Sequence, residues 1–278
     1  MKKPTNKFFI LTITTILLTI LIGCDTKSTT INKNIETNIE TNIETNIEKQ
    51  TLVKENEYVS YGQFLGYEQK TKQTSTNYKE CLTTIQVDNK VCTGNILDFY
   101  NGKTIISTAK HIFKSDENKQ DFYLKITFFN GDVLEMNNFK PIFSTSNCDI
   151  CFIICDYNLE EKNNVKAIDL TQKIKNEKYY SLGETFYFAN CSIANNIKYD
   201  IMATPYVGTD ITLNDVSGGS FDIYMNHNEI PETINGSSGC GVFNENGLCI
   251  GFLYRYEGQM LKLIPLNYII EDLNTFFN

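Results

Sequence analysis

Short apolar runs separated by tight turns fill residues 81–265, and this pattern restricts the fold of the chain more than any other feature. Residues 91–113, VCTGNILDFYNGKTIISTAKHIF, contain two β-rich segments joined by Asn101-Gly102, the dipeptide that type I′ hairpin turns prefer. Asn130-Gly131 and Asn246-Gly247 repeat this signal. Many short strands at close spacing predict an all-β barrel or sandwich.

The C-terminus departs from the strand pattern. Its apolar residues follow the i, i+3, i+4, i+7 spacing of an amphipathic helix. These residues are Leu266, Ile269, Ile270, Leu273, Phe276 and Phe277. We therefore expect residues 266–277 to form a helix that packs against the last strands.

The N-terminus is typical of an export signal. Residues 1–23 begin with lysines and continue into an apolar run, residues 8–22, which is shorter than the ~20 residues that a membrane-spanning helix needs. The run ends in LIGC, which resembles the bacterial lipobox, where the chain is cut before the cysteine and lipid is attached to it. An uncleaved anchor is the alternative. In both cases we expect the rest of the chain outside the cytoplasm, and a lipid on Cys24 would hold it at a membrane.

Residues 24–57 are of low complexity and contain TNIE repeats, and residues 34–48 read NIETNIETNIETNIE. A short coiled coil is one interpretation of this four-residue period. The heptad spacing is absent, however, and like charges recur at i, i+4, which is unfavourable in a helix. The composition favours a solvated tether between the lipid and a folded domain at residues 58–278.

The charge of the chain limits its partners. The formal net charge is −8, and Arg255 is the single arginine. Nucleic-acid binding depends on Lys and Arg to neutralise phosphates, so we expect no nucleic-acid partner and no basic membrane-binding face.

Eight cysteines follow Cys24. An even number in an exported chain is compatible with disulfides, although the pairing cannot be deduced from sequence. Small buried hydrophobic side chains are the other interpretation. Cys148 and Cys151 form a CxxC, but residues three apart on a strand face opposite ways and no second ligand pair has zinc-like spacing. We expect no metal site.

Three short motifs contain residues suited to catalysis, in the order histidine, carboxylate, serine. His111 follows a strand in TIISTAKHIF, and Asp149 precedes an apolar strand in NCDICFII. A carboxylate there can accept an imidazole Nδ1–H and fix its tautomer; Asp156, at the far end of the same strand, is the competing candidate. Ser238 lies in INGSSGCGVF and needs an adjacent base to act as a nucleophile. The flanking glycines would let the amides of Gly236 and Ser238 point at one oxyanion.

STAKHI, DICFII and INGSSGCGVF, in this order, resemble the motifs of the trypsin/chymotrypsin-fold serine peptidases, including bacterial trypsin-like and HtrA-type forms. The resemblance covers roughly residues 75–270. It implies two six-stranded antiparallel β-barrels of chymotrypsin type, at about residues 75–160 and 175–265, followed by the C-terminal helix. It also implies a serine endopeptidase that acts on proteins or peptides and needs no metal or cofactor.

The resemblance implies a role for each residue of the site. Ser238 would attack the scissile carbonyl, His111 would carry the proton, and Asp149 would orient His111. The amides of Gly236 and Ser238 would form the oxyanion hole.

The resemblance extends to substrate contacts. The strand Phe252-Leu253-Tyr254 would pair with the substrate backbone as an added strand. Glu232 lies where trypsin-like relatives place an acidic group at the floor of the specificity pocket, which would favour a basic side chain; a surface glutamate is the simpler interpretation.

Two alternatives to a serine endopeptidase stay open from sequence. Cys240 stands where the family has its second glycine after the nucleophile. A cysteine peptidase could use Cys240, although viral enzymes of that kind have a glycine where this chain has Ser238. The other alternative is a catalytically inactive barrel that serves as a surface binding module.

Overall fold

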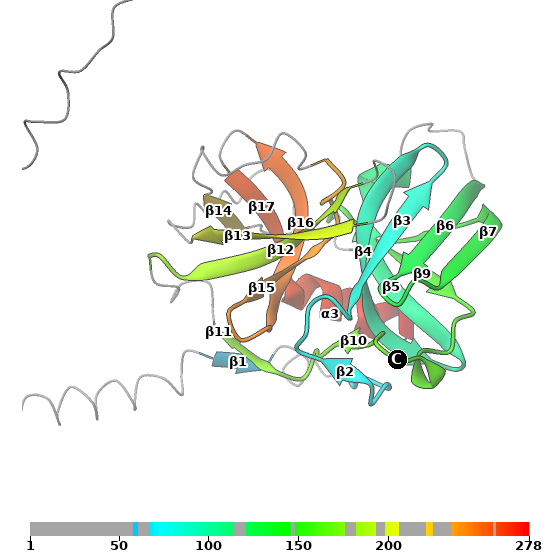
Figure 1. Cartoon of the computed structure of the whole chain (residues 1–278). Helices are drawn as coiled ribbons and strands as arrows, with labels where there is room; N and C mark the ends of the chain where they lie inside the picture. The colour runs from blue at the N-terminus through cyan, green and yellow to red at the C-terminus, as the bar shows by residue number, and fades with distance from the viewer. Residues whose placement is uncertain are drawn as a thin grey trace, which may run out of the picture. The chain divides into compact units, whose positions relative to one another are not determined.

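The computed structural model describes residues 58–60, 67–113, 121–145, 148–175, 182–192, 198–205, 221–224, 235–257 and 260–277. Within these ranges the chain is strand-rich and ends in one α-helix, as the sequence predicts (Figure 1). Cys24, the TNIE repeats and Glu232 lie outside the described residues. No helix in the described part of the chain combines the length and the apolar character needed to cross a membrane.

The first sheet is antiparallel and, over the described residues, contains seven strands in the order β7-β6-β3-β4-β5-β9-β8. This is one strand more than the six expected, because the short β8 pairs with β9 at one edge. The strands are β3 Leu82–Val87, β4 Lys90–Tyr100, β5 Lys103–Ala109, β6 Phe122–Phe128, β7 Val133–Phe139, β8 Ile142–Phe143 and β9 Ile150–Cys155. The 3-10 helix η1, Lys110–Phe113, follows β5 directly, and η2, Leu159–Glu161, follows β9.

The second sheet is also antiparallel and has six strands among the described residues, in the order β13-β12-β15-β16-β17-β14. The strands are β12 Thr185–Ser192, β13 Lys198–Pro205, β14 Phe221–Tyr224, β15 Gly241–Asn244, β16 Cys249–Glu257 and β17 Met260–Pro265. Two short pairs involve the segment between the sheets: β1 Tyr58–Ser60 with β11 Lys173–Lys175, and β2 Thr74–Ser75 with β10 Ala167–Ile168.

The hairpin turns follow from their Asn-Gly dipeptides, but with two geometries. Asn101 and Gly102 both have positive φ, 51° and 79°, between the paired β4 and β5, which confirms the type I′ turn. At Asn130-Gly131 only the glycine has a positive φ, 91°, and its N–H donates to Phe128 O at 2.9 Å. This is the longer loop in which a type I turn is followed by a left-handed glycine.

The C-terminal helix α3, Leu266–Phe277, begins and ends where the apolar spacing predicts. It contacts β16 and β17, as expected, but it also contacts the first sheet. The rings of Phe276 and Phe277 lie edge-on to Phe152 of β9, with centroids 6.0 and 6.4 Å away. Asp272 Oδ1 accepts hydrogen bonds from the backbone and the hydroxyl of Thr145. Burial of one apolar face therefore joins the helix to both sheets.

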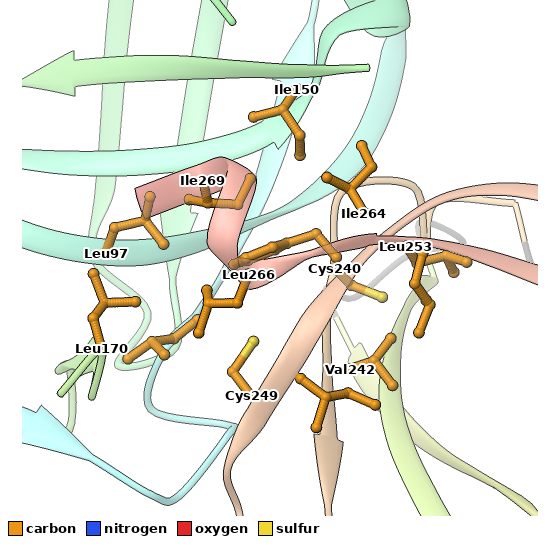
Figure 2. Close-up of a cluster of buried hydrophobic side chains, with 14 of the residues drawn as sticks. Leu97, Ile150, Leu170, Cys240, Val242, Cys249, Leu253, Ile264, Leu266 and Ile269 are labelled. Atoms are coloured by element: carbon orange, nitrogen blue, oxygen red, sulfur yellow. The ribbon is translucent and has the colours of Figure 1, made fainter. Parts of the chain in front are cut away.

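One hydrophobic cluster is shared by the two sheets and α3. Figure 2 shows side chains of this cluster, among them Leu97 and Ile150 of the first sheet, Val242 and Leu253 of the second, and Leu266 of α3. A second cluster fills the interior of the first sheet. The extensive burial shared across the sheets stabilises their association, since each buried aliphatic side chain contributes roughly 1.5–3 kcal/mol.

Seven of the eight cysteines after Cys24 belong to these clusters, and Cys191 is buried but is part of neither. All eight cysteines after Cys24 are buried and none of them forms a disulfide, so the described structure supports the interpretation as small hydrophobic side chains and not the disulfide one. Burial raises the pKa of Cys92, Cys155 and Cys249 to about 12, which keeps these thiols protonated.

A buried carboxylate on β4 anchors residues 67–71. Asp98 is fully buried and accepts hydrogen bonds from the Tyr67 hydroxyl at 2.6 Å and from the backbone N–H groups of Lys70, Thr71 and Phe99 at 3.0, 2.8 and 2.7 Å. Burial and the neighbouring Asp98 raise the pKa of Tyr67, so its hydroxyl stays a donor. Asp98 thereby joins residues 67–71 to the first sheet.

Replacement of this carboxylate is expected to destabilise the domain. Asp98→Ala removes an acceptor from four buried or half-buried donors, which we expect to lower the free energy of unfolding by about 3 kcal/mol or more. Urea unfolding of the purified domain followed by circular dichroism measures the change. Asp156→Ala is the control, because its side chain is 81% exposed and its ion pair with Lys103 lies at the surface. Equal midpoints for the two variants would contradict the anchoring role of Asp98.

Candidate active site

His111 and Asp149 meet because β5 and β9 are neighbouring antiparallel strands. Ala109, the last residue of β5, lies opposite Ile150, the first residue of β9. The residues just outside this pair therefore lie at the same edge of the sheet. His111 Nδ1 is 2.6 Å from Asp149 Oδ2, and the His111 backbone N–H donates to Asp149 Oδ1 at 2.8 Å. The backbone N–H of Lys110 donates to Asp149 O at 3.1 Å, which fixes the same corner.

The arrangement suits a general base. With Nδ1–H held by the carboxylate, the imidazole keeps Nε2 for a second partner. The His111 side chain is 46% exposed, so the imidazole is accessible from solvent. The competing carboxylate is excluded by its position: Asp156 follows the other end of β9 and forms an ion pair with Lys103 at 3.0 Å.

Ser238 lies in a tight turn that depends on glycine. The N–H of Cys240 donates to Ser237 O at 3.0 Å, and Gly239, third in this four-residue turn, has a φ of +85°, as in a type II turn. Gly236 has a φ of +104°, and a Cβ there would lie 2.7 Å from Cys191 O. Both glycines therefore adopt a conformation that side chains disfavour. Ser238 is half-buried, whereas Ser237 is 1% exposed.

The turn that contains Ser238 packs against the end of β5. The last residue of β5, Ala109, precedes His111 by two positions in the chain. A Cβ on Gly239 would lie 2.5 Å from Thr93 O and 2.7 Å from Ala109 N, so only glycine allows this approach. The N–H of Thr93 donates to Ser238 O at 3.1 Å. The fold thus brings together the end of β5, the start of β9 and the turn before β15, the three places from which the predicted residues come.

Two residues of β4 hold the serine turn, and the sequence interpretation did not include them. Thr93 Oγ1 donates to Gly236 O at 2.8 Å, and the Asn95 side chain hydrogen-bonds to Gly239 and Gly241. The signal in the sequence was weak. Thr93 and Asn95 are polar residues two apart on a strand whose following residues are apolar, which places both on one face. The glycines to which they hydrogen-bond, Gly236 and Gly239, lie more than 140 residues later in the chain.

Cys240 is enclosed by the core. Its side chain is 0% exposed and lies among the apolar residues of the shared cluster (Figure 2). Burial raises the pKa of its thiol far above the usual range, so the reactive thiolate is disfavoured. The structure therefore argues against Cys240 as the nucleophile.

The expected substrate strand needs a correction. Phe252 lies between β15 and β17, opposite Gly241 on one side and Ile264 on the other. Leu253 N–H donates to Cys240 O at 2.8 Å, and Leu253 O accepts from the N–H of Gly239 at 2.6 Å. An added strand cannot pair with Phe252 or Leu253, because the protein's own strands and the serine turn already use their backbone. Tyr254, the next residue, stays a prediction.

Comparison with known proteins yields structural neighbours only. No protein-family model matches the sequence, and no curated protein matches it. The chain is similar to a variant of the HtrA-type protease AlgW with a tripeptide, with a TM-score of 0.51 and 11% identity over 74% of this chain and 64% of that one. It is also similar to the serine endoprotease from Yersinia pestis, with a TM-score of 0.48 and 14% identity over 74% and 67% of the two chains. For Deg5 the TM-score is 0.49, with 11% identity over 69% and 86%.

At this level of identity the likeness concerns the fold. The two antiparallel sheets, the C-terminal helix and the similarity to AlgW agree with one another. The chain therefore has the all-β, chymotrypsin-like fold of the trypsin-like serine proteases.

Proposed function

We propose that the protein is a serine endopeptidase that uses His111, Asp149 and Ser238. The observation that carries the proposal is the His111–Asp149 pair at 2.6 Å, at the edge of the first sheet against which the Ser238 turn packs. A carboxylate–imidazole pair next to a serine hydroxyl is the arrangement that activates an alcohol at neutral pH. The AlgW neighbour, an HtrA-type protease with a tripeptide, makes a peptide the natural substrate class.

Each proposed residue has a defined step. Ser238 Oγ attacks the carbonyl carbon of the scissile bond while its proton passes to His111 Nε2. The oxyanion that forms is stabilised by the amides of Gly236 and Ser238. Collapse of the tetrahedral intermediate expels the amine, which takes the proton from His111, and leaves an acyl group on Ser238. Water, deprotonated by His111, then hydrolyses this ester.

The proposal for substrate contacts rests on sequence position. We propose Tyr254 as a substrate contact, and the hydrogen bond between its chain neighbour Leu253 and Gly239 of the serine turn supports this. Glu232 precedes Ser238 by six residues in the chain, and we propose it as the acidic group that favours a basic side chain before the cleaved bond.

We also propose that a lipid on Cys24 anchors the enzyme outside the cytoplasm. The apolar residues 8–22 and the LIGC that ends the signal region support this proposal, and residues 24–57 supply the tether.

Substitution of the proposed nucleophile is expected to abolish activity. In Ser238→Ala no alcohol remains to form an acyl-enzyme or a covalent adduct. We expect labelling by a fluorophosphonate probe to be lost and casein hydrolysis to fall by roughly 10³-fold or more. Gel fluorescence and release of labelled casein peptides measure the two effects.

Two neighbours of Ser238 provide matched controls. Ser237→Ala removes the adjacent, almost fully buried serine, and Cys240→Ala removes the rival nucleophile. Both variants should still be labelled, and iodoacetamide should not inhibit the wild type. If Ser238→Ala kept its activity while Cys240→Ala lost it, the enzyme would be a cysteine peptidase. A folded wild type that no probe labels would favour the binding module.

The pairing of His111 with Asp149 is expected to be necessary. Asp149→Asn keeps the shape but replaces one acceptor oxygen with a donor, so it cannot accept from both Nδ1–H and the backbone N–H of His111. The wrong imidazole tautomer should lower kcat/KM by about 10³–10⁴-fold. Asp156→Asn is the control at the other end of β9 and should change kcat/KM less than about twofold. Equal losses in both variants would contradict the assignment of Asp149.

Lipid attachment is tested separately from catalysis. Full-length protein expressed in bacteria should incorporate an alkyne analogue of palmitate and sediment with membranes. Cys24→Ala should lose the lipid and move to the soluble fraction, because its side chain cannot form the thioether. Cys155→Ala, a change at a buried core cysteine, should retain the lipid. Lipid incorporation that survives in Cys24→Ala would refute the anchor.

A further inference from the structure

Asn95 is a fully buried polar side chain in the middle of the first sheet. It lies on β4, opposite Leu82 of β3 and Ser107 of β5, and it is 0% exposed. Burial of a side-chain amide without hydrogen-bond partners costs free energy. The partners of the Asn95 amide therefore indicate the role of this residue.

Both hydrogen bonds of the Asn95 amide reach the backbone that follows Ser238. Asn95 Nδ2 donates to Gly239 O at 2.5 Å, and Asn95 Oδ1 accepts from the N–H of Gly241 at 2.6 Å. One planar group thereby satisfies an acceptor and a donor on either side of Cys240. Only one orientation of the amide, with nitrogen toward the carbonyl, matches both partners.

The local sequence is adapted to this contact. Gly241 lies so close that a Cβ there would be 2.9 Å from Asn95 Oδ1, and a Cβ on Gly239 would collide with Thr93 and Ala109. Of the side chains of this length, only Asn presents a donor and an acceptor in the required geometry, since Asp would direct an oxygen at the carbonyl of Gly239.

The strand β4 therefore holds the proposed nucleophile on both sides. Thr93 binds Gly236 O and Ser238 O, and Asn95 binds the two glycines that follow. We propose that Asn95 is a positioning residue: it fixes the turn so that the hydroxyl and the amides near Ser238 are in place before substrate arrives. This inference rests on the proposed peptidase function. Preorganised donors and nucleophiles need no rearrangement during the reaction, and small displacements of such groups reduce rates strongly.

The kinetics of fluorophosphonate labelling test the inference without a known substrate. Labelling of the folded full chain at several probe concentrations gives the maximal rate kinact and the apparent affinity KI, and the end point gives the fraction of labelled protein. The variants are Asn95→Ala and Asn95→Ser; the serine keeps one hydroxyl for one of the two hydrogen bonds. Ser107→Ala and Ile96→Val are the controls, since both residues are as buried as Asn95, and Ser107 Oγ has no hydrogen-bond partner within the described part of the chain.

We expect Asn95→Ala to lower kinact by roughly 10–100-fold with KI changed less than about twofold and the final labelled fraction unchanged. Asn95→Ser should fall between the alanine variant and the wild type, and both controls should keep the wild-type kinact. A wild-type kinact with only a smaller labelled fraction would mean that Asn95 stabilises the fold and does not position the turn, which would overturn the inference. An unlabelled, folded wild type would instead overturn the proposed function and the inference with it.

Discussion

The contact between β4 and the turn of residues 236–241 is the constraint on which the candidate site depends. His111 and Asp149 lie directly beyond the ends of β5 and β9 of the first sheet, whereas Ser238 precedes β15 of the second. Hydrogen bonds from Thr93 and Asn95 connect the two. Each such bond contributes only about 1 kcal/mol to stability. In a buried network, however, loss of one partner leaves a polar group unsatisfied at a high cost in free energy. The hydrogen bonds of Thr93 and Asn95 together therefore hold the turn more firmly than the value for each bond suggests.

Close approach of the two sheets explains why the residues at this contact are glycines and other small residues. Gly236 and Gly239 combine a positive φ with backbone atoms less than 3 Å from where a Cβ would be, so turn geometry and packing both require glycine. The neighbours Cys191 and Cys240 are small, apolar and fully buried. In a chain without tryptophan, such thiols fill the narrow space between strands and remain protonated, whereas Ser238 is only half-buried.

Further contacts stabilise the frame that this site needs. Helix α3 packs its apolar face on β16 and β17, while Phe276 and Phe277 contact β9 of the first sheet and Asp272 binds Thr145 in the connection before β9. Asp98 joins residues 67–71 to β4, the same strand that contains Thr93 and Asn95.

The sequence by itself determined the features that depend on neighbouring residues. Asn101-Gly102 specified a type I′ turn, the apolar spacing specified α3, and the glycines around Ser238 indicated a constrained turn, because φ preferences and periodicity are local properties. It also placed His111 and Asp149 at strand ends, from which their pairing could be expected. Only the tertiary structure decided that Phe252 and Leu253 are already paired, that the eight buried cysteines form no disulfide, and that Asn95 reaches the serine turn. These depend on which strands lie side by side, and strand pairing is set by contacts between residues far apart in the chain.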